Sequence, residues 1–133
     1  MYLTQGLQRS LQRHPHKTAL VHLGEGAQRQ HRFDALIDQV ARQATALAAR
    51  GIGTGDRVAL LAPNTDQLVL ALLACWWRGA VACPLNTRWS EAEIAHALED
   101  SGAALLLADE AFASWAAGAP TPRCTLDAFA HEA

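Results

Sequence analysis

The stretch that constrains the fold most is residues 51–86, where two short apolar runs are separated by a longer apolar segment. The first run, residues 57–62, follows a cluster of glycine and aspartate, and its nearly continuous hydrophobicity is typical of a strand buried on both faces of a parallel sheet. Residues 80–83 form the second run, and a proline follows each of them. The segment between the runs is long enough for a helix, so the stretch predicts a β-α-β unit.

The helix that joins these strands is expected to end at Arg78. Asn64 is its predicted N-cap, and Asp66 lies where the positive end of the helix dipole favours an anion. Gly79 provides the left-handed residue that ends the helix. Apolar side chains are placed all round it: Leu68, Val69, Leu70, Leu72, Leu73, Trp76 and Trp77. Because such a helix is normally buried on every side, we expect the chain to self-associate where the rest of the fold leaves it uncovered.

The residues before this unit predict a short helix and a β-hairpin. Residues 5–13 carry leucines on one face, and Thr4 is the expected cap of that helix. Two β-prone segments, residues 18–23 and 28–33, flank a turn with two glycines at residues 24–27. This pattern is typical of two antiparallel strands joined by a tight turn.

A second helix is predicted from Phe33 to about Ala48, and Gly51 is expected to close it. Its apolar residues recur at helical spacing and form one core-facing side. The opposite, polar side is expected to carry Asp34, Asp38, Arg42 and Gln43.

A third helix has the clearest start in the chain. Ser90 and Glu93 have the spacing of a capping box, in which each residue hydrogen-bonds the backbone of the other. Trp89 and Ile94 occupy the two positions of a hydrophobic staple. The sequence therefore predicts a helix that begins after Ser90.

This helix is expected to end at Gly102, and the apolar residues 103–108 predict a further strand of the parallel sheet. After that strand the chain becomes alanine-rich and then rich in glycine and proline, before a short strand candidate at residues 123–126. We therefore divide the chain into an α/β subdomain at residues 1–109 and an Ala/Pro-rich tail at residues 110–133.

Composition narrows the functional classes. The chain has 133 residues and a formal charge of −2 without a long basic run, which argues against nucleic-acid binding. Cys75, Cys83 and Cys124 are an odd number of cysteines without metal-ligand spacing, which indicates reduced core residues. No apolar run approaches the roughly 20 residues that span a bilayer, and no signal-peptide pattern is present. We therefore expect a soluble, single-core protein of the cytoplasm.

Several short motifs occur in an order that resembles the N-terminal part of the AMP-forming acyl-CoA synthetases, the adenylate-forming or AMP-binding superfamily. In chain order they are PHKTALV at residues 15–21, Phe33 and Leu36, GIGTGDRV at residues 51–58, Asn64, Gly79 with Ala80, PLN at residues 84–86 and SGA at residues 101–103. The resemblance covers about residues 3–109. It implies an α/β fold, a three-layer parallel-sheet unit with an N-terminal β-hairpin, which corresponds to the first subdomain of these enzymes.

Two residues depart from the family pattern at the start of the second helix. Arg32 stands where the family usually has a capping Ser or Thr, and Ala35 stands where it usually has Glu. The resemblance therefore implies that this helix lacks a capping box and relies on Asp34 to complement its dipole.

The parts of the family that perform chemistry have no match in this sequence. These are a Ser/Thr-Gly-rich phosphate loop that ends in Pro-Lys-Gly, an adenine site, a ribose-binding aspartate and a catalytic lysine. A loop of that kind works because converging backbone N–H groups and a lysine bind phosphate oxygens. We therefore assign no catalytic, cofactor-binding or metal-binding residue and expect the chain alone to be inactive. The resemblance implies ATP, Mg²⁺ and CoA for the full-length parent enzyme.

Two patterns have both a functional and an ordinary interpretation. The glycines of residues 51–55 could indicate a dinucleotide loop, but such a loop follows a strand and opens a helix, whereas this one follows a helix and opens a strand. A metal site could be built from His14, His16, His22 and His31. Their irregular spacing and a turn-rich surface favour ordinary exposed histidines.

Two side chains with a possible chemical role have a simpler structural one. Trp76 and Trp77 could line an acyl pocket in a full enzyme, although packing in a core or interface is the simpler interpretation. Ser90 has no base and orienting residue that the sequence pairs with it, and it already has a role as a helix cap.

The sequence hypothesis is thus the N-terminal fragment of an acid–CoA ligase that acts on a fatty acid or a related carboxylic acid through an acyl-adenylate. Its expected partner is the remainder of the parent enzyme, for which this segment is scaffold. The alternative is a stand-alone, non-catalytic α/β interaction module derived from the same family.

Overall fold

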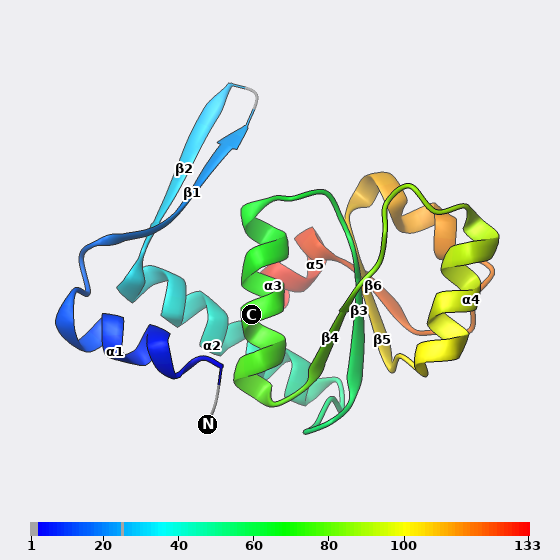
Figure 1. Cartoon of the computed structure of the whole chain (residues 1–133), viewed down its shortest axis with the longest axis horizontal. Coiled ribbons are helices and arrows are strands. Elements are labelled where there is room, and N and C mark those ends of the chain that lie inside the picture. The colour runs from blue at the N-terminus through cyan, green and yellow to red at the C-terminus, as the bar shows by residue number, and fades with distance from the viewer. Residues whose placement is uncertain (1–2, 25) are drawn as a thin grey trace.

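Four short parallel strands form the centre of the computed structural model, which describes residues 3–24 and 26–133 (Figure 1). Their spatial order is β4 (Val81–Pro84), β3 (Arg57–Leu61), β5 (Leu105–Ala108) and β6 (Arg123–Thr125). In the central register, Val58 lies opposite Ala82 on one side and Leu105 on the other. The two central strands are buried except for Arg57, as expected for strands covered on both faces.

Alternate side chains of the central strands divide the core between two faces of the sheet. Val58 and Leu60 belong to a cluster that includes α2, α3 and α5, whereas Ala59 and Leu61 pack with α4 and a 3-10 helix, η1. These elements are α2 (Phe33–Ala49), α3 (Asp66–Arg78), α4 (Glu91–Ser101), η1 (Glu110–Ala116) and α5 (Leu126–Glu132). The result is a helix, sheet and helix sandwich, which confirms the predicted three-layer α/β unit.

The predicted β-hairpin is also present and lies apart from the main sheet. It consists of β1 (Thr18–Gly24) and β2 (Ala27–Arg32) in antiparallel pairing, and it projects away from the sheet in Figure 1. Glu25, in the predicted turn, lies outside the described residues. A small apolar cluster ties the base of the hairpin and α1 (Gln5–Arg13) to α2 and α3. Its members include Leu7, Leu20, Leu36, Val40 and Leu70.

The start of α4 confirms the capping box. The Glu93 amide donates to Ser90 Oγ at 3.2 Å, and the Ser90 amide donates to Glu93 Oε2 at 2.7 Å. Trp89 and Ile94 lie in the same apolar cluster, as a staple requires. The helix ends at Gly102, whose φ of 63° is the left-handed conformation predicted for it.

The start of α2 agrees with the departures from the family pattern. Arg32 occupies the N-cap position without a capping hydrogen bond from its side chain. Asp34 instead accepts a hydrogen bond from the Ala35 amide at 2.8 Å, within the first turn where the dipole favours an anion. An ion pair with Arg32 lowers the pKa of Asp34.

One predicted cap is wrong, and another has the predicted position without a capping hydrogen bond. Thr65, and not Asn64, caps α3, because the extended Thr65 accepts a hydrogen bond from the Leu68 amide at 3.3 Å and Asn64 lies one residue too early. Thr4 occupies the N-cap position of α1, but its side chain makes no capping hydrogen bond. Thr4 is instead buried, at 4% exposure.

Gln43 was predicted on the polar side of α2 and is buried at 5% exposure. The reason is that both α3 and α5 cover α2. Its buried side is therefore wider than it would be if one helix packed against it. The Gln43 Oε1 atom has no hydrogen-bond partner among the described residues. This amide is therefore a polar group that the apolar periodicity did not predict.

The C-terminal residues extend the same sheet. Strand β6 pairs with β5 and confirms the strand predicted near residues 123–126. Helix α5 then places Leu126 and Phe129, at 3% and 1% exposure, in the cluster under α3. No helix in the described residues has the length and hydrophobicity to cross a membrane.

Candidate functional site

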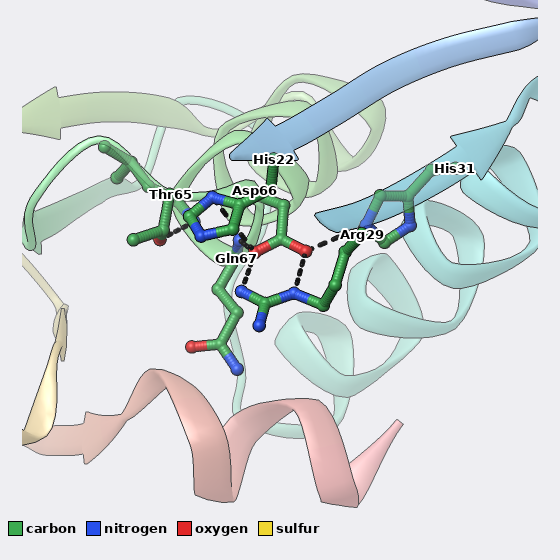
Figure 2. Close-up of polar contacts among 7 residues, drawn as sticks. His22, Arg29, His31, Thr65, Asp66 and Gln67 are labelled. Carbon is green, nitrogen blue, oxygen red and sulfur yellow. Dashed lines mark hydrogen bonds and ion pairs between the residues drawn. The ribbon is translucent and has the colours of Figure 1, made fainter. Parts of the chain in front are cut away.

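The most concentrated polar cluster among the described residues surrounds the first residue of α3. Asp66 is only 4% exposed, and its carboxylate points toward the hairpin, as Figure 2 shows. Arg29 Nε donates to Asp66 Oδ2 at 2.8 Å, and Arg29 Nη2 donates to Oδ1 at 2.7 Å. This is the bidentate geometry that a guanidinium forms with a carboxylate.

Two histidines and a backbone amide complete the surroundings of this carboxylate. His31 Nε2 lies 2.9 Å from Asp66 Oδ2, and the Gln67 amide donates to Oδ1 at 3.0 Å. His22 Nδ1 lies farther away, at 3.9 Å from Oδ1. Both histidines belong to the hairpin, one on each strand. The cluster therefore ties the hairpin to α3 through one acidic side chain.

The hydrogen bonds from Arg29 hold the pKa of Asp66 well below its usual range, although burial acts in the opposite direction. His31 adds to this lowering. The hydrogen bond with Asp66 in turn raises the pKa of Arg29. An ionised carboxylate whose oxygens already accept these bonds is a poor general base, so the geometry favours an anchoring role over proton transfer.

A groove of about 490 Å³ lies beside this cluster, between the hairpin, α2, α3 and α5. Its charged lining residues are largely engaged with one another: Arg29 with Asp66, and Arg42 with Asp38 at 2.9 Å. Charged residues of both signs line the groove, so it presents no field of one sign to a ligand. The described residues also contain no group of three or more His, Cys, Asp or Glu side chains able to hold a metal ion.

The structure separates the four histidines that the sequence placed together. His22 and His31 are 16% and 13% exposed and face Asp66, so the prediction of ordinary exposed histidines is wrong for these two. The reason is strand alternation, since both project from the side of the hairpin that faces α3. His16 is 77% exposed near Asp34, and His14 is also exposed.

Sequence reasoning did not find Arg29, the main partner of Asp66. The two residues lie 37 positions apart, and their contact depends on how the hairpin folds over α3. One signal was available in the sequence. Arg29 and His31 are two residues apart in one strand, and the predicted pairing puts His22 opposite them, so that all three lie on one side of the hairpin. Asp66 was predicted only to complement the helix dipole.

The glycine-rich residues 51–55 form a turn that is tied to the rest of the fold. Asp56 Oδ2 accepts a hydrogen bond from the Gly53 amide at 2.7 Å, and Arg78 Nε donates to the Ile52 carbonyl at 2.8 Å. Gly55 has a φ of 83°, a conformation that favours glycine. The turn follows α2 and opens β3, which agrees with its interpretation as a structural connection.

The remaining sequence candidates also have structural surroundings. Trp77 packs against the apolar cluster of α2 and α3, whereas Trp76 is half-buried on another side of the helix. Cys75, Cys83 and Cys124 are free thiols. Burial raises the pKa of Cys75 to about 12, so this thiol stays protonated.

Comparison with known proteins places these features in a family. A family profile described as AMP-binding enzyme matches residues 7–130. A feruloyl-CoA synthase from an Amycolatopsis species is 44% identical over 93 residues, which are 70% of this chain and 18% of that protein. A Mycobacterium tuberculosis CoA ligase, named for a propanoyl group on a methylated dioxo-octahydroindene ring, is 36% identical over 125 residues, 94% of this chain and 24% of that protein.

A solved structure agrees with this match. The o-succinylbenzoate CoA synthetase of Bacillus subtilis, in complex with its acyl-adenylate intermediate, has a TM-score of 0.85 and 32% identity over 97% of this chain and 33% of that one. The same enzyme in complex with ATP and a magnesium ion gives a TM-score of 0.82 at 31% identity, over 96% of this chain and 34% of that one. The chain thus spans about a fifth to a quarter of the two curated relatives.

Proposed function

Because the chain belongs to the AMP-binding enzyme family, we propose that it is the N-terminal scaffold segment of an AMP-forming acid–CoA ligase. The observation that carries the proposal is the family match over residues 7–130, together with the 32% identity and TM-score of 0.85 to an acyl-CoA synthetase. The relatives described above are CoA ligases or synthases, and their remaining length has no counterpart in this chain.

The proposed reaction of the whole ligase has two steps. A carboxylate oxygen attacks the α-phosphorus of ATP, which forms acyl-AMP and releases pyrophosphate. The CoA thiol then attacks the acyl carbonyl and displaces AMP. ATP, Mg²⁺ and CoA belong to this proposal, since the Bacillus subtilis relative was solved with ATP and a magnesium ion.

The described residues do not form a nucleotide site, so we assign them no role in either chemical step. A phosphate site needs several hydrogen-bond donors that point into one unoccupied space. Here the guanidinium of Arg29 is paired with Asp66, and that of Arg42 is paired with Asp38. The proposed contribution of this segment is therefore structural. It supplies a sheet, its covering helices and an anchored hairpin on which the rest of the ligase is built.

The acid and the cellular location are the least specific parts of the proposal. A fatty acid is one candidate, and the names of the two relatives add an aromatic acid and a ring-bearing propanoic acid. A cytoplasmic location is consistent with three free cysteines, which suit a reducing compartment. A panel of acids for any assay should therefore include all three acid classes.

Acid-dependent exchange of pyrophosphate into ATP tests the proposed function. We expect exchange from the longer ligase that contains this segment and none from the 133-residue chain. Reading the gene past Ala133 should reveal a phosphate-binding loop within a few tens of codons. Exchange by the 133-residue chain would refute the scaffold role, and absence of exchange from the longer polypeptide with every acid class would refute the ligase assignment.

A further inference from the structure

One side of α3 carries apolar residues where a surface helix carries polar ones. Val69, Leu72, Leu73 and Trp76 form what we call the outer stripe of α3, at the spacing i, i+3, i+4 and i+7. These residues lie opposite the buried ones, which include Leu70, Ala71, Ala74 and Cys75. All four residues of the outer stripe are partly exposed. Leu72 and Leu73 each also pack against a core cluster, whereas neither Val69 nor Trp76 belongs to one in the described part of the chain.

No charged residue lies on α3 between its first and last positions. Asp66 is engaged by Arg29, and Arg78 donates to the Ile52 carbonyl at the other end. An amphipathic surface helix normally has charged residues on its solvent side, and a helix that is apolar all round is normally buried. The composition of α3 is therefore that of an interior helix.

The elements of this chain cover only part of α3. Helices α2 and α5 and the hairpin strand β1 pack against it, and the sheet lies beneath. In Figure 1 the helix lies at the front, with no other element drawn over it. The sequence predicted such an uncovered side, and the structure shows it as half-exposed because neighbouring elements flank the helix.

We propose that the outer stripe of α3 is the surface on which the rest of the ligase packs. The inference rests on the proposed function, because it takes its partner from the part of the CoA-ligase relatives that this chain lacks. That part is large, since the chain covers 24% of the Mycobacterium tuberculosis ligase. The uncharged stripe requires an equally apolar partner surface, since a charge buried against it would lack compensation.

The test is recovery of the two parts as a complex. The 133-residue chain is co-expressed with a separate polypeptide that encodes the rest of the same ligase, and the amount that copurifies is measured. Val69→Lys combined with Trp76→Glu should lower recovery by about tenfold or more, because charges at the centre of an apolar interface are poorly tolerated. A matched control, Ala92→Lys with Ala95→Glu, places the same two charges at exposed positions of α4 and should leave recovery unchanged.

Circular dichroism shows whether each variant chain remains folded. If the double variant does not fold, the single change Trp76→Gln replaces it and should lower recovery in the same direction. A self-associated form of the wild-type chain that dissociates when the remaining polypeptide is added supports the proposal. A dimer that persists would make a second copy the true occupant of the outer stripe and would overturn the proposal.

Undiminished recovery of the stripe variants would also overturn the proposal. This outcome differs from failure of the proposed function, which is read separately as pyrophosphate exchange by the longer ligase. An active ligase whose remaining polypeptide binds the stripe variants as well as the wild type refutes only the docking surface. A ligase without acid-dependent exchange refutes the function, whatever the recovery.

Discussion

Helices α3 and α4 cover opposite faces of the same parallel sheet, but their outer sides differ in chemistry. The outer side of α4 is exposed and carries Glu91, Glu93, Glu99 and Asp100. The outer stripe of α3 carries only Val, Leu and Trp. The two helices each cover one face of the sheet, but their outer sides suit different surroundings. The α4 side suits solvent, and the α3 side suits another layer of protein.

The two helices also begin differently. A capping box of neighbouring residues starts α4, and both of its hydrogen bonds are exposed. At the start of α3, Thr65 supplies an ordinary cap, while the buried Asp66 joins the helix to a distant hairpin. The first arrangement is local and solvent-exposed, and the second depends on the tertiary fold. Each difference leads to a measurable contrast between the two sides of the sheet.

The largest effect is expected from the residue that fills the core beneath α3. Phe129→Ala should lower the free energy of unfolding by about 3 to 5 kcal/mol, because Phe129 is 1% exposed and its loss leaves a cavity. Leu23→Ala, at a site that is 80% exposed, is the control and should change stability by no more than about 0.5 kcal/mol. Urea denaturation measures both. Equal urea midpoints for Phe129→Ala and Leu23→Ala would mean that packing of α5 beneath α3 does not stabilise the fold.

Arg29→Met should lower the free energy of unfolding measurably, since it leaves the buried Asp66 carboxylate without its main partner. The loss is limited because the Arg29 side chain is 53% exposed, and because His31 and the Gln67 amide still contact Asp66. Arg42→Met is the matched control, because Arg42 and Asp38 are both more than 60% exposed. It should cost about 0.5 kcal/mol or less. Similar losses in the two variants would show that the α3 anchor is no stronger than a surface ion pair.

The Arg29–Asp66 pair also predicts that stability depends on pH. Arg29 lowers the pKa of folded Asp66, whereas unfolded Asp66 titrates near its ordinary value of about 3.9. The unfolded chain therefore binds the proton first as pH falls. The stabilisation is present above about pH 4 and is lost as pH falls further, toward the pKa of the folded state.

The stability difference between the wild-type chain and Arg29→Met should consequently narrow between about pH 5 and about pH 3. Urea denaturation across this range measures it. Asp34 and Glu132 also have lowered pKa values, but they are present in both chains, so their contributions cancel in the difference. A difference that stays constant or widens on acidification would contradict the ionised pair.

The smallest effect is expected at the start of α4. Ser90→Ala should lower the free energy of unfolding by about 0.5 to 2 kcal/mol through loss of the cap. The loss should be smaller than that of Arg29→Met, because solvent can satisfy the exposed Glu93 amide. Thermal denaturation compares the two variants. An unchanged melting temperature for Ser90→Ala would show that the capping box does not contribute measurably to stability.

Patterns within a short stretch of sequence predicted most of the fold. The apolar runs at β3 and β5 predicted buried parallel strands, and the predicted ends of the strands lie within two residues of those observed. The spacing of Ser90 and Glu93 predicted a cap that needs only neighbouring residues. These features depend on local hydrogen bonding and on hydrophobic period, and both can be read from adjacent residues.

The polar cluster could not be predicted in the same way. Arg29 and Asp66 meet only when the hairpin folds over α3, and no spacing rule relates residues so far apart. Gln43 is buried because two helices cover α2, which the periodicity of one helix does not show. The choice between Asn64 and Thr65 as cap depends on the backbone angles of two adjacent residues that can each cap a helix.

Radical footprinting of Trp76 and Trp89 tests the contrast between the two sides of the sheet most directly. Both side chains are half-buried in this chain, Trp76 on the outer stripe of α3 and Trp89 beside α4. Oxidation of each is measured by mass spectrometry in the 133-residue chain and in its complex with the remainder of the proposed ligase. We predict that Trp76 becomes several-fold less reactive in the complex while Trp89 is unchanged. Protection of Trp89 with Trp76 still reactive would contradict the assignment of α3 as the interior helix.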